Sequence, residues 1–334
     1  MRRLAVALAG AALLAAVSTT AFAGGPGGNR SDLKNFQHVW VVMMENTGYD
    51  ALIGNPNAPF VNEAAATYGS ATSYYGVTHP SQPNYIAVTS GSTNGVPDDG
   101  DYTIDVPNIV DQLETHGKTW RDYQQSLALC DGDKLKHSCG NQLYERKHNP
   151  FVSYADVQSS PARMANVVDY SQLDADLASG NVADYNFVAP DQCHDMHGRG
   201  GDFATDPCSY GHTQDLIAAG DAFLRDFVDR VTSSPSWTGN SVIFITWDES
   251  DFTDSPTDFG FGDTSGCCDA DPGGGHVVTI AISHSDHTAR SSDTPYNHYS
   301  LLATIQDAWK LGCLAYTCDV ADVPRMTDLV GPRG

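Results

Sequence analysis

Three short apolar runs are each followed at once by polar side chains. Residues 38–44, 185–188 and 242–247 are largely apolar, which is typical of strands buried on both faces of a sheet. The runs lead into Glu45-Asn46, Pro190-Asp191 and Asp248-Glu249, respectively. The pattern therefore predicts three buried strands that end in polar groups.

Helical patterns alternate with these strands. They cover residues 60–68 and 108–115, and a final helix is expected from about Tyr299 to Lys310. A longer amphipathic segment places one group of apolar residues on a single helical face: Leu216, Phe223, Leu224, Phe227, Val228 and Val231. The alternation predicts an α/β fold with a mainly parallel central sheet flanked by helices on both faces. Ligands bind such sheets at the carboxyl ends of the strands, where the acidic pairs are expected to meet.

The segment 78–85, Thr-His-Pro-Ser-Gln-Pro-Asn-Tyr, places a hydroxyl where a helix is expected to begin. Pro80 and Pro83 restrict the backbone, and helix-compatible residues follow them. Free backbone N–H groups at a helix start stabilise an oxyanion or a phosphate, so Ser81 is a candidate nucleophile. The alternative is an ordinary serine cap followed by a proline-rich turn.

The first 23 residues have the composition of a secretory signal peptide. Arg2 and Arg3 precede an apolar stretch, and residues 21–23 read Ala-Phe-Ala, a typical cleavage site. We therefore expect a secreted, extracellular protein whose residues 24–334 form a single domain, because no linker composition interrupts them. The apolar stretch is shorter than the roughly 20 residues of a membrane span, which predicts no stable membrane anchor.

The chain is strongly acidic. Its formal charge of −23 becomes −25 once Arg2 and Arg3 leave with the signal, because 18 basic residues fall to 16 against 41 acidic ones. Such a surface repels polyanions at long range, although a local cation reverses the sign inside a pocket. The charge therefore excludes nucleic acid as the expected partner, and most of it serves solubility.

Eight cysteines in an exported chain favour disulfides over metal–thiolate sites. Three pairs with short spacings suggest disulfides that close local loops: Cys130 with Cys139, Cys193 with Cys208, and Cys313 with Cys318. Cys267 and Cys268 are adjacent, and a bridge between neighbours is strained. Either these two bond each other, or the three local pairings are partly wrong.

The polar groups suit metal-assisted phosphoryl transfer. Carboxylate and amide oxygens with an occasional imidazole are ligands for a hard or borderline divalent cation, with Ca, Mg, Mn and Zn all open. Asp195 and His197 would point the same way from an extended segment and so reach one ion. A seryl hydroxyl beside a cation can form a phosphoenzyme. A Ser-His-Asp acyl hydrolase is the rival chemistry, but Ser81 lacks the G-x-S-x-G surroundings.

Several phrases together resemble the bacterial and fungal phosphoesterase family, which includes secreted acid phosphatases and the non-haemolytic type of phospholipase C. The resemblance covers about residues 38–309 in order and at compatible spacing, and it looks most like the secreted acid phosphatases of actinobacteria. It implies an alkaline-phosphatase-like fold. The phrases are Met43-Met44-Glu45-Asn46, the 78–85 segment, Arg146-Lys147-His148-Asn149-Pro150-Phe151, Asp195-Met196-His197, residues 220–224, Thr246-Trp247-Asp248-Glu249 and Asn297-His298-Tyr299-Ser300.

The resemblance also implies roles for these residues. Ser81 would be the nucleophile and a metal ligand, and His197 would contact phosphate or protonate the leaving group beside Asp195. The metal ligands implied are Glu45, Asn46, Ser81, Asp248 and Glu249, and Asn46 would also bind phosphate. Two positions depart from relatives: Glu249 stands where some have aspartate, and Asp191 where many have asparagine, so the number of metal ions stays open.

Four other histidines and one lysine have competing interpretations. His148 either binds phosphate or makes a structural hydrogen bond, and His298 either serves the site or caps the last helix. His276, just before an expected strand at 277–282, resembles a site position of the superfamily. His79 is expected to hold the nucleophile loop, and Lys147 to be a surface lysine rather than a phosphate ligand.

The combined expectation is a phosphatase that acts on monoesters through phosphorylated Ser81 with a divalent cation. A phospholipase C is the alternative, for which Tyr74, Tyr75, Phe252, Phe259 and Phe261 would form a lipid-facing rim. A protein that captures phosphate or a metal without turnover is the alternative from another class. The partner would be a small phosphate ester or a phospholipid head group, and the oligomeric state is left open.

Overall fold

The computed structural model describes Leu33 and residues 35–202, 204–250 and 262–330. The expected signal peptide, Phe252, Phe259 and Phe261 lie outside these residues. All the described residues belong to one compact unit.

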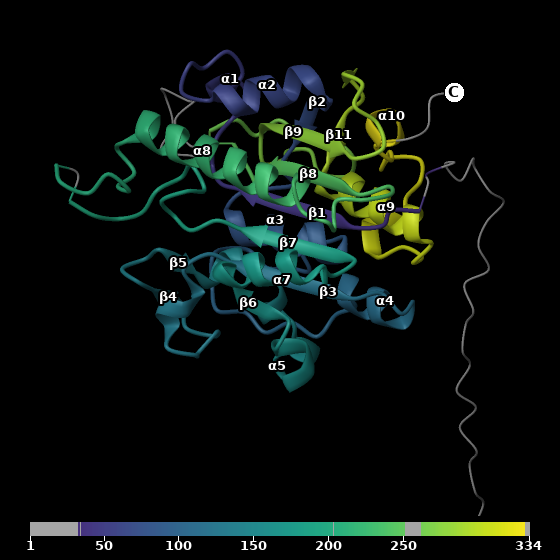
Figure 1. The fold of residues 1–334 in the computed structure, drawn as a ribbon, viewed down its shortest axis with the longest axis horizontal. Helices are drawn as coiled ribbons and strands as arrows, with labels where there is room; N and C mark the ends of the chain where they lie inside the picture. The colour runs from purple at the N-terminus through teal and green to yellow at the C-terminus, as the bar shows by residue number, and fades with distance from the viewer. Residues whose placement is uncertain (1–32, 34, 203, 251–261, 331–334) are drawn as a thin grey trace, which may run out of the picture. The chain divides into compact units, whose positions relative to one another are not determined.

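Nine strands of the described chain form one sheet, in the order β10-β2-β9-β8-β1-β7-β3-β6 with β11 beside β2. Their bounds are β1 Val39–Met44, β2 Gly69–Tyr75, β3 Trp120–Gln124, β6 Val167–Asp169, β7 Tyr185–Ala189, β8 Val242–Trp247, β9 His276–Ser283, β10 Arg290–Ser292 and β11 Tyr296–Asn297. A separate hairpin pairs β4 Ser138–Cys139 with β5 Tyr144–Glu145. Strand β1 runs at the centre of the sheet (Figure 1).

The sheet is mainly parallel, as the sequence predicts. Strand β1 pairs in parallel with β8 on one side and β7 on the other. Strand β9 is the exception, because it runs antiparallel to both β8 and β2. Every residue of β1 and of β8 is buried, which explains why their sequences are apolar without alternation.

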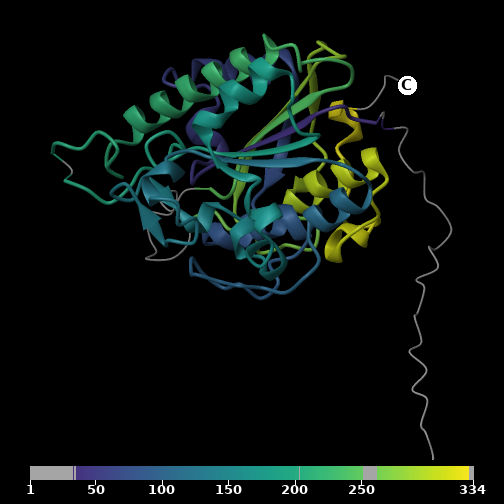
Figure 2. The same cartoon turned by 60° about the horizontal axis from the view of Figure 1, so that its bottom comes forward.

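Helices cover both faces of the sheet, α2 and α8 on one and α3 and α9 on the other (Figure 2). The longer helices are α2 Pro59–Thr67, α3 Ser81–Ser90, α4 Ile109–Thr115, α7 Leu173–Ser179, α8 Thr213–Thr232 and α9 His298–Trp309. Single-turn helices are α1 Tyr49–Leu52, α5 Ala155–Gln158, α6 Pro161–Met164 and α10 Thr327–Val330. The α/β fold class is therefore confirmed. The helices expected over residues 60–68, 108–115 and 299–310 begin and end within about one residue of their predicted bounds, and α8 contains the expected amphipathic segment.

All four cysteine pairs form disulfides: Cys130–Cys139, Cys193–Cys208, Cys267–Cys268 and Cys313–Cys318. The three local pairings are confirmed, and the adjacent cysteines bond each other. Each bridge closes a loop outside the sheet.

The glycine-rich loop 262–275 lies against the segment that leads to Ser81. Gly76 donates to Gly275 O at 2.9 Å and accepts from the N–H of Gly274 at 2.9 Å. A side chain at Gly76 would place its Cβ 2.7 Å from Asp248 O. Glycine therefore allows the three backbones to approach closely at the edge of the sheet where the acidic residues lie.

Candidate active site

Of the three polar groups predicted to meet at the sheet edge, those after β1 and β8 do so, whereas the carboxylate of Asp191, after β7, bonds Ser126 and His194. Met44 at the end of β1 pairs with Trp247 at the end of β8, so Glu45-Asn46 and Asp248-Glu249 leave the sheet side by side. Asn46 donates its backbone N–H to Asp248 Oδ1 at 3.1 Å and its side-chain amide to Glu249 Oε1 at 3.2 Å. Parallel pairing of two neighbouring strands thus forms one polar cluster.

Ser81 is the first residue of α3, and its hydroxyl points into this cluster. Its Oγ lies 3.0 Å from Glu45 Oε2 and 3.1 Å from Glu249 Oε1, with Asn46 Oδ1 at 3.4 Å. The side chain is 1% exposed. A hydroxyl placed between two carboxylate oxygens has an acceptor for its proton on either side.

Glu45 is held by groups from helix α3 and from a short 3-10 helix. The hydroxyl of Tyr85, one turn beyond Ser81 in α3, donates to Glu45 Oε1 at 2.6 Å. His148, in a short 3-10 helix spanning Arg146–His148, places Nε2 3.1 Å from the same oxygen and stacks on Tyr85. Burial alone would raise the pKa of Glu45, but His148, Lys147 and His197 outweigh it and hold that pKa far below its usual value.

Asp248 and Glu249 have the opposite shift. Burial, followed by repulsion from Glu45, raises the pKa of Asp248 well above that of a free aspartate. Its Oδ1 accepts from the N–H groups of Asn46 and Glu249, while Oδ2 has no hydrogen-bond partner among the described residues. Burial also raises the pKa of Glu249, although His79 bonds its Oε2. His79 therefore does hold the nucleophile loop, through Glu249 and through Asp263 O.

The prediction that Asp195 and His197 project from an extended segment is wrong. The chain turns at Met196, which has a φ of 80°, and Asp195 Oδ1 accepts the N–H of His197 at 2.8 Å. Asp195 instead organises its own loop, and its carbonyl accepts from the N–H of Glu45 at 2.9 Å. His197 does face the site, with Nδ1 3.7 Å from Glu45 Oε2.

His298 and His276 lie in the same region but are engaged elsewhere. His298 opens α9 fully buried, with Nε2 2.6 Å from Asp248 O and Nδ1 3.1 Å from the hydroxyl of Tyr74. Asn297, not His298, caps the helix. His276 stacks on Tyr49 and places Nε2 3.0 Å from Thr72 O. Both ring nitrogens of His298 form hydrogen bonds within the protein, and the contacts of His276 do not include Ser81. The geometry of these contacts therefore does not support phosphate binding by either histidine.

Lys147 is not the surface lysine that was expected. Its side chain is 16% exposed, and its ammonium lies 2.9 Å from Asp99 Oδ2. Burial would lower the pKa of Lys147, but Glu45, Asp99 and Asp248 raise it. Asp99 Oδ1 also accepts from the backbone N–H of Gln82 at 2.9 Å. One carboxylate thus binds both the lysine and the start of the nucleophile helix, two donors suited to an anion.

The donor set fits a divalent cation. Glu45, Asp195, Asp248 and Glu249 are all 0% exposed, and buried carboxylates that repel one another cannot all ionise without a compensating charge. The unpartnered Oδ2 of Asp248 is a further oxygen available to an ion. Oxygen ligands of this kind suit Ca²⁺, Mg²⁺ or Mn²⁺.

Two contributors were missed by sequence reasoning. Tyr85 lies four residues after Ser81, and residues at that spacing share a helical face, so its contact with Glu45 was open to prediction. Asp99 comes from a loop distant from every motif, and nothing in the sequence indicates its contacts. The expected aromatic rim is also wrong at Tyr74, which is 0% exposed.

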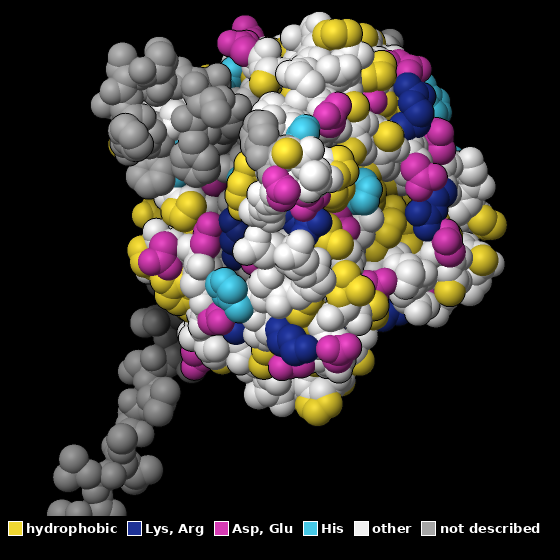
Figure 3. All heavy atoms as spheres, turned by 90° about the vertical axis from the view of Figure 1, so that its left-hand side faces the viewer, with side chains coloured by type: hydrophobic (Ala, Val, Ile, Leu, Met, Phe, Trp, Pro, Cys, Tyr) yellow, Lys and Arg dark blue, Asp and Glu magenta, His cyan; other side chains and the backbone are white. Residues whose placement is uncertain are grey.

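The face at the carboxyl ends of β1 and β7 carries mixed charges (Figure 3). Lysine, arginine, histidine and acidic side chains intermingle there with hydrophobic ones. The strongly negative total charge therefore does not make this face uniformly acidic, and an anionic ligand can approach it.

Solved structures of the alkaline phosphatase superfamily share this fold. A member from Vibrio parahaemolyticus aligns with a TM-score of 0.57 and 15% identity over 91% of this chain and 72% of its own. A phosphonate monoester hydrolase of Agrobacterium radiobacter aligns with a TM-score of 0.57 and 11% identity over 82% and 74%. At such identities the likeness concerns the fold alone, and it confirms the alkaline-phosphatase-like architecture.

The chain belongs to the Phosphoesterase family, whose model matches residues 55–312. It is 27% identical to a phosphatidylinositol-3-phosphatase of Mycobacterium tuberculosis over 90% of this chain and 85% of the relative. It is 25% identical to a probable acid phosphatase of Kluyveromyces lactis over 83% of this chain and 59% of the relative, and 25% identical to an acid phosphatase of Aspergillus fumigatus over 84% and 56%. The chain thus spans somewhat over half the length of these fungal relatives. The family resemblance seen in the sequence is confirmed.

Proposed function

We propose that the protein is a secreted phosphatase that hydrolyses phosphate monoesters through a phosphorylated Ser81. The observation that carries the proposal is the Ser81 hydroxyl, buried at the start of α3 between Glu45 Oε2 at 3.0 Å and Glu249 Oε1 at 3.1 Å. The related proteins named as acid phosphatases and as a phosphatidylinositol-3-phosphatase support the same class of reaction. Within the described residues, no helix is both long and apolar enough to cross a membrane.

In the first step the Ser81 oxygen attacks phosphorus while its proton passes to a carboxylate. Glu45 Oε2 and Glu249 Oε1, which lie 3.0 and 3.1 Å from Oγ, are the carboxylate oxygens placed to take it. A bond forms between Oγ and phosphorus, and the bond from phosphorus to the ester oxygen breaks. Water then attacks the phosphoserine, which releases phosphate and restores the Ser81 hydroxyl.

Glu45, Asn46, Ser81, Asp248 and Glu249 would hold the divalent cation. When bound, such an ion lowers the pKa of the nucleophile's hydroxyl and neutralises charge on the phosphoryl group. The five residues also maintain one another's positions, since Asn46 donates to both Asp248 and Glu249.

His197, His148 and Lys147 surround the space beside Glu45 and would contact the phosphate. Burial lowers the pKa of His197 to about 3, so its imidazole is neutral in the free protein at the pH of most assays. A phosphate dianion beside the ring would raise that pKa and let His197 donate a proton to the leaving oxygen. Lys147 would exchange its contact with Asp99 for one with the substrate.

The test compares Ser81→Ala with Ser90→Ala, a matched change on the same helix whose hydroxyl bonds Ile86 O. Each purified protein is assayed on a simple phosphate monoester and on phosphatidylcholine, from acidic to alkaline pH. Ser81→Ala should lower monoester turnover on the order of a thousandfold or more, and rapid quenching of the parent should trap a phosphoserine at position 81. The control should keep most of its activity.

Other results would redirect the assignment. Preference for the lipid diester would establish a phospholipase C, which the buried Tyr74 does not favour. Absence of turnover on every ester by the unmodified protein would indicate phosphate or metal capture instead.

A further inference from the structure

Tyr210 is a half-exposed aromatic residue that contacts the candidate active site. It is 51% exposed, one of few large hydrophobic side chains so exposed in the described part of the chain. Its ring centroid lies 5.0 Å from that of His197, with 43° between the two planes. No motif drew attention to this residue, because it comes thirteen positions after His197 in a polar loop.

Exposure falls in steps from Tyr210 towards the nucleophile. The side chain of His197 is 19% exposed, and that of Glu45, against which His197 lies, is 0% exposed. The charges of Lys147, Asp195 and Glu45 all act on the hydroxyl of Tyr210, whose pKa is raised mainly by burial. Contacts therefore run from the exposed Tyr210 through His197 to Glu45, which bonds Ser81.

The backbone around Tyr210 is fixed by several contacts. Its N–H donates to Arg199 O at 3.1 Å, and Arg199 donates to Cys208 O at 2.8 Å. The disulfide Cys193–Cys208 closes the same loop. Gly198 has a φ of +87°, and a Cβ there would lie 2.6 Å from Leu216 Cδ1. These contacts fix the backbone that carries the ring before any ligand arrives, which lowers the entropic cost of binding.

We propose that Tyr210, together with His197, forms a platform for the leaving group and selects phosphate monoesters of aromatic alcohols. The inference rests on the proposed phosphatase function, with phosphate beside Ser81 and the ester oxygen directed towards His197. An aromatic leaving group directed away from that point would meet these two rings, which are tilted by 43° to each other, so it can stack on one and contact the edge of the other. An aliphatic leaving group such as glycerol would gain little from the same surface.

The test measures kcat/KM for phenyl phosphate and for glycerol 2-phosphate in the parent protein and three variants. Tyr210→Ala should lower the ratio of the two values, phenyl over glycerol, by about two- to tenfold, which corresponds to one aromatic contact. Tyr210→Phe keeps the ring and should keep the ratio. Tyr316→Ala is the matched control, since Tyr316 is also exposed and stacks on Tyr299 away from Ser81, and it should change neither value.

Inhibition by phenylphosphonate and methylphosphonate gives a readout that does not depend on turnover. Tyr210→Ala should weaken inhibition by phenylphosphonate by the same factor and leave inhibition by methylphosphonate unchanged. Equal losses on both esters would mean that Tyr210 only supports the loop, and an unchanged ratio would mean that it does not meet the leaving group; either result overturns the inference while the phosphatase function stands. No turnover of either ester by the parent would overturn the proposed function, and this inference with it.

Discussion

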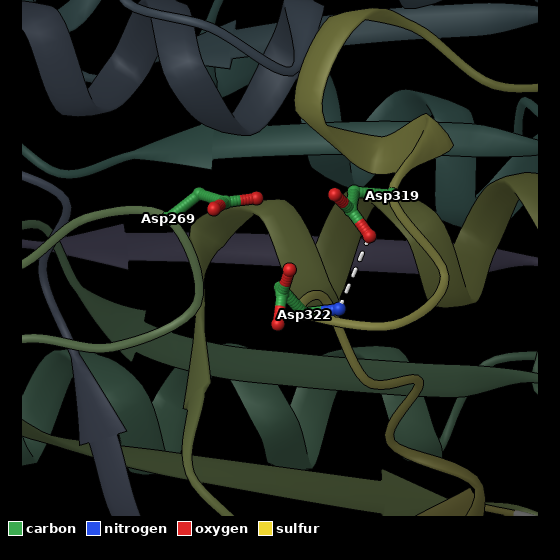
Figure 4. Close-up of side chains that lie close together, drawn as sticks. All are labelled: Asp269, Asp319 and Asp322. Atoms are coloured by element: carbon green, nitrogen blue, oxygen red, sulfur yellow. Dashed lines mark hydrogen bonds between the residues drawn. The ribbon is translucent and has the colours of Figure 1, made fainter.

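Two groups of acidic residues differ in what surrounds them. Glu45, Asp248 and Glu249 are fully buried at the end of the central strands. Asp269, Asp319 and Asp322 are exposed, and each offers an oxygen within 4.8 Å of the other two (Figure 4). The exposed group is thus the tighter of the two in distance. Within this exposed group, the N–H of Asp322 donates to Asp319 Oδ1 at 3.2 Å.

Environment distinguishes the two groups better than proximity does. Water and salt screen the exposed carboxylates, so closeness there has a small effect. The buried carboxylates do not meet directly but are joined through Ser81 and Asn46, and their pKa values diverge in both directions from the usual one. Groups whose pKa values are shifted by burial and by neighbouring charges cluster at functional sites, and the exposed group has no nucleophile of this kind beside it.

Of the changes that test the difference between the two groups, removal of divalent cations should have the largest effect on activity and stability. Prolonged chelation should abolish monoester hydrolysis and lower the melting temperature by about 5 °C, because buried carboxylates lose their compensating charge. Adding back single cations should restore both, and the cation that does so most effectively would be identified. The triple variant Asp269→Asn, Asp319→Asn, Asp322→Asn should respond to chelation like the parent. If chelation removes all bound metal and activity persists, the metal-assisted mechanism is wrong.

Asp248→Asn should have the next largest effect. The substitution keeps the side-chain shape but removes a charged ligand, so kcat/KM for a phosphate monoester should fall by about a hundredfold or more. Asp319→Asn, the same change in the exposed group, should leave kcat/KM within about twofold of the parent. Activity of the two variants measured over a range of cation concentrations separates weakened metal binding from other causes. Comparable losses in both would contradict the distinction between the groups.

Much of the site was predictable because its residues are tied to strand ends. The apolar runs of β1 and β8 locate their own boundaries, and parallel pairing then brings Glu45 and Asp248 to one edge without further information. Ser81 was recognisable from the prolines beside it and from its helix. The roles of these residues stay predictions, but their meeting follows from local sequence and sheet topology.

The remainder depended on loops whose paths no local pattern specifies. The turn at Met196 redirects Asp195 away from the expected extended geometry. Asp99 reaches Lys147 from a segment 48 positions away, and only the folded chain shows that Lys147 is enclosed. Strands β2 and β3 carry polar residues and were not predicted, because their burial comes from helices packed by distant parts of the chain.

A third kind of carboxylate refines the comparison, since Asp122 is buried without belonging to the site. It lies in β3, is 0% exposed, and accepts from Gln124 Nε2 at 2.8 Å. Burial raises its pKa to about 8, with smaller opposing contributions from Gln124 and Lys134. If burial alone made a carboxylate functional, Asp122→Asn would impair turnover as Asp248→Asn does. We expect it to leave kcat/KM unchanged.

The effect of Asp122→Asn should appear in stability and depend on pH. The folded protein keeps the Asp122 proton up to about pH 8, whereas the unfolded chain releases it near pH 4. The folded state therefore binds more protons between these values, and the free energy of unfolding falls as pH rises through that window. Asparagine does not titrate in this range. The free energy of unfolding of the variant should therefore rise relative to that of the parent by on the order of a few kcal/mol between pH 5 and pH 9. Denaturant unfolding of both proteins at pH 5, 7 and 9 measures this, because every other titration cancels in the difference. If the difference in the free energy of unfolding between the two proteins stays constant across that range, Asp122 is ionised in the folded protein. Lys134 would then compensate the buried charge of Asp122 in β3, as a cation would compensate the carboxylates around Ser81.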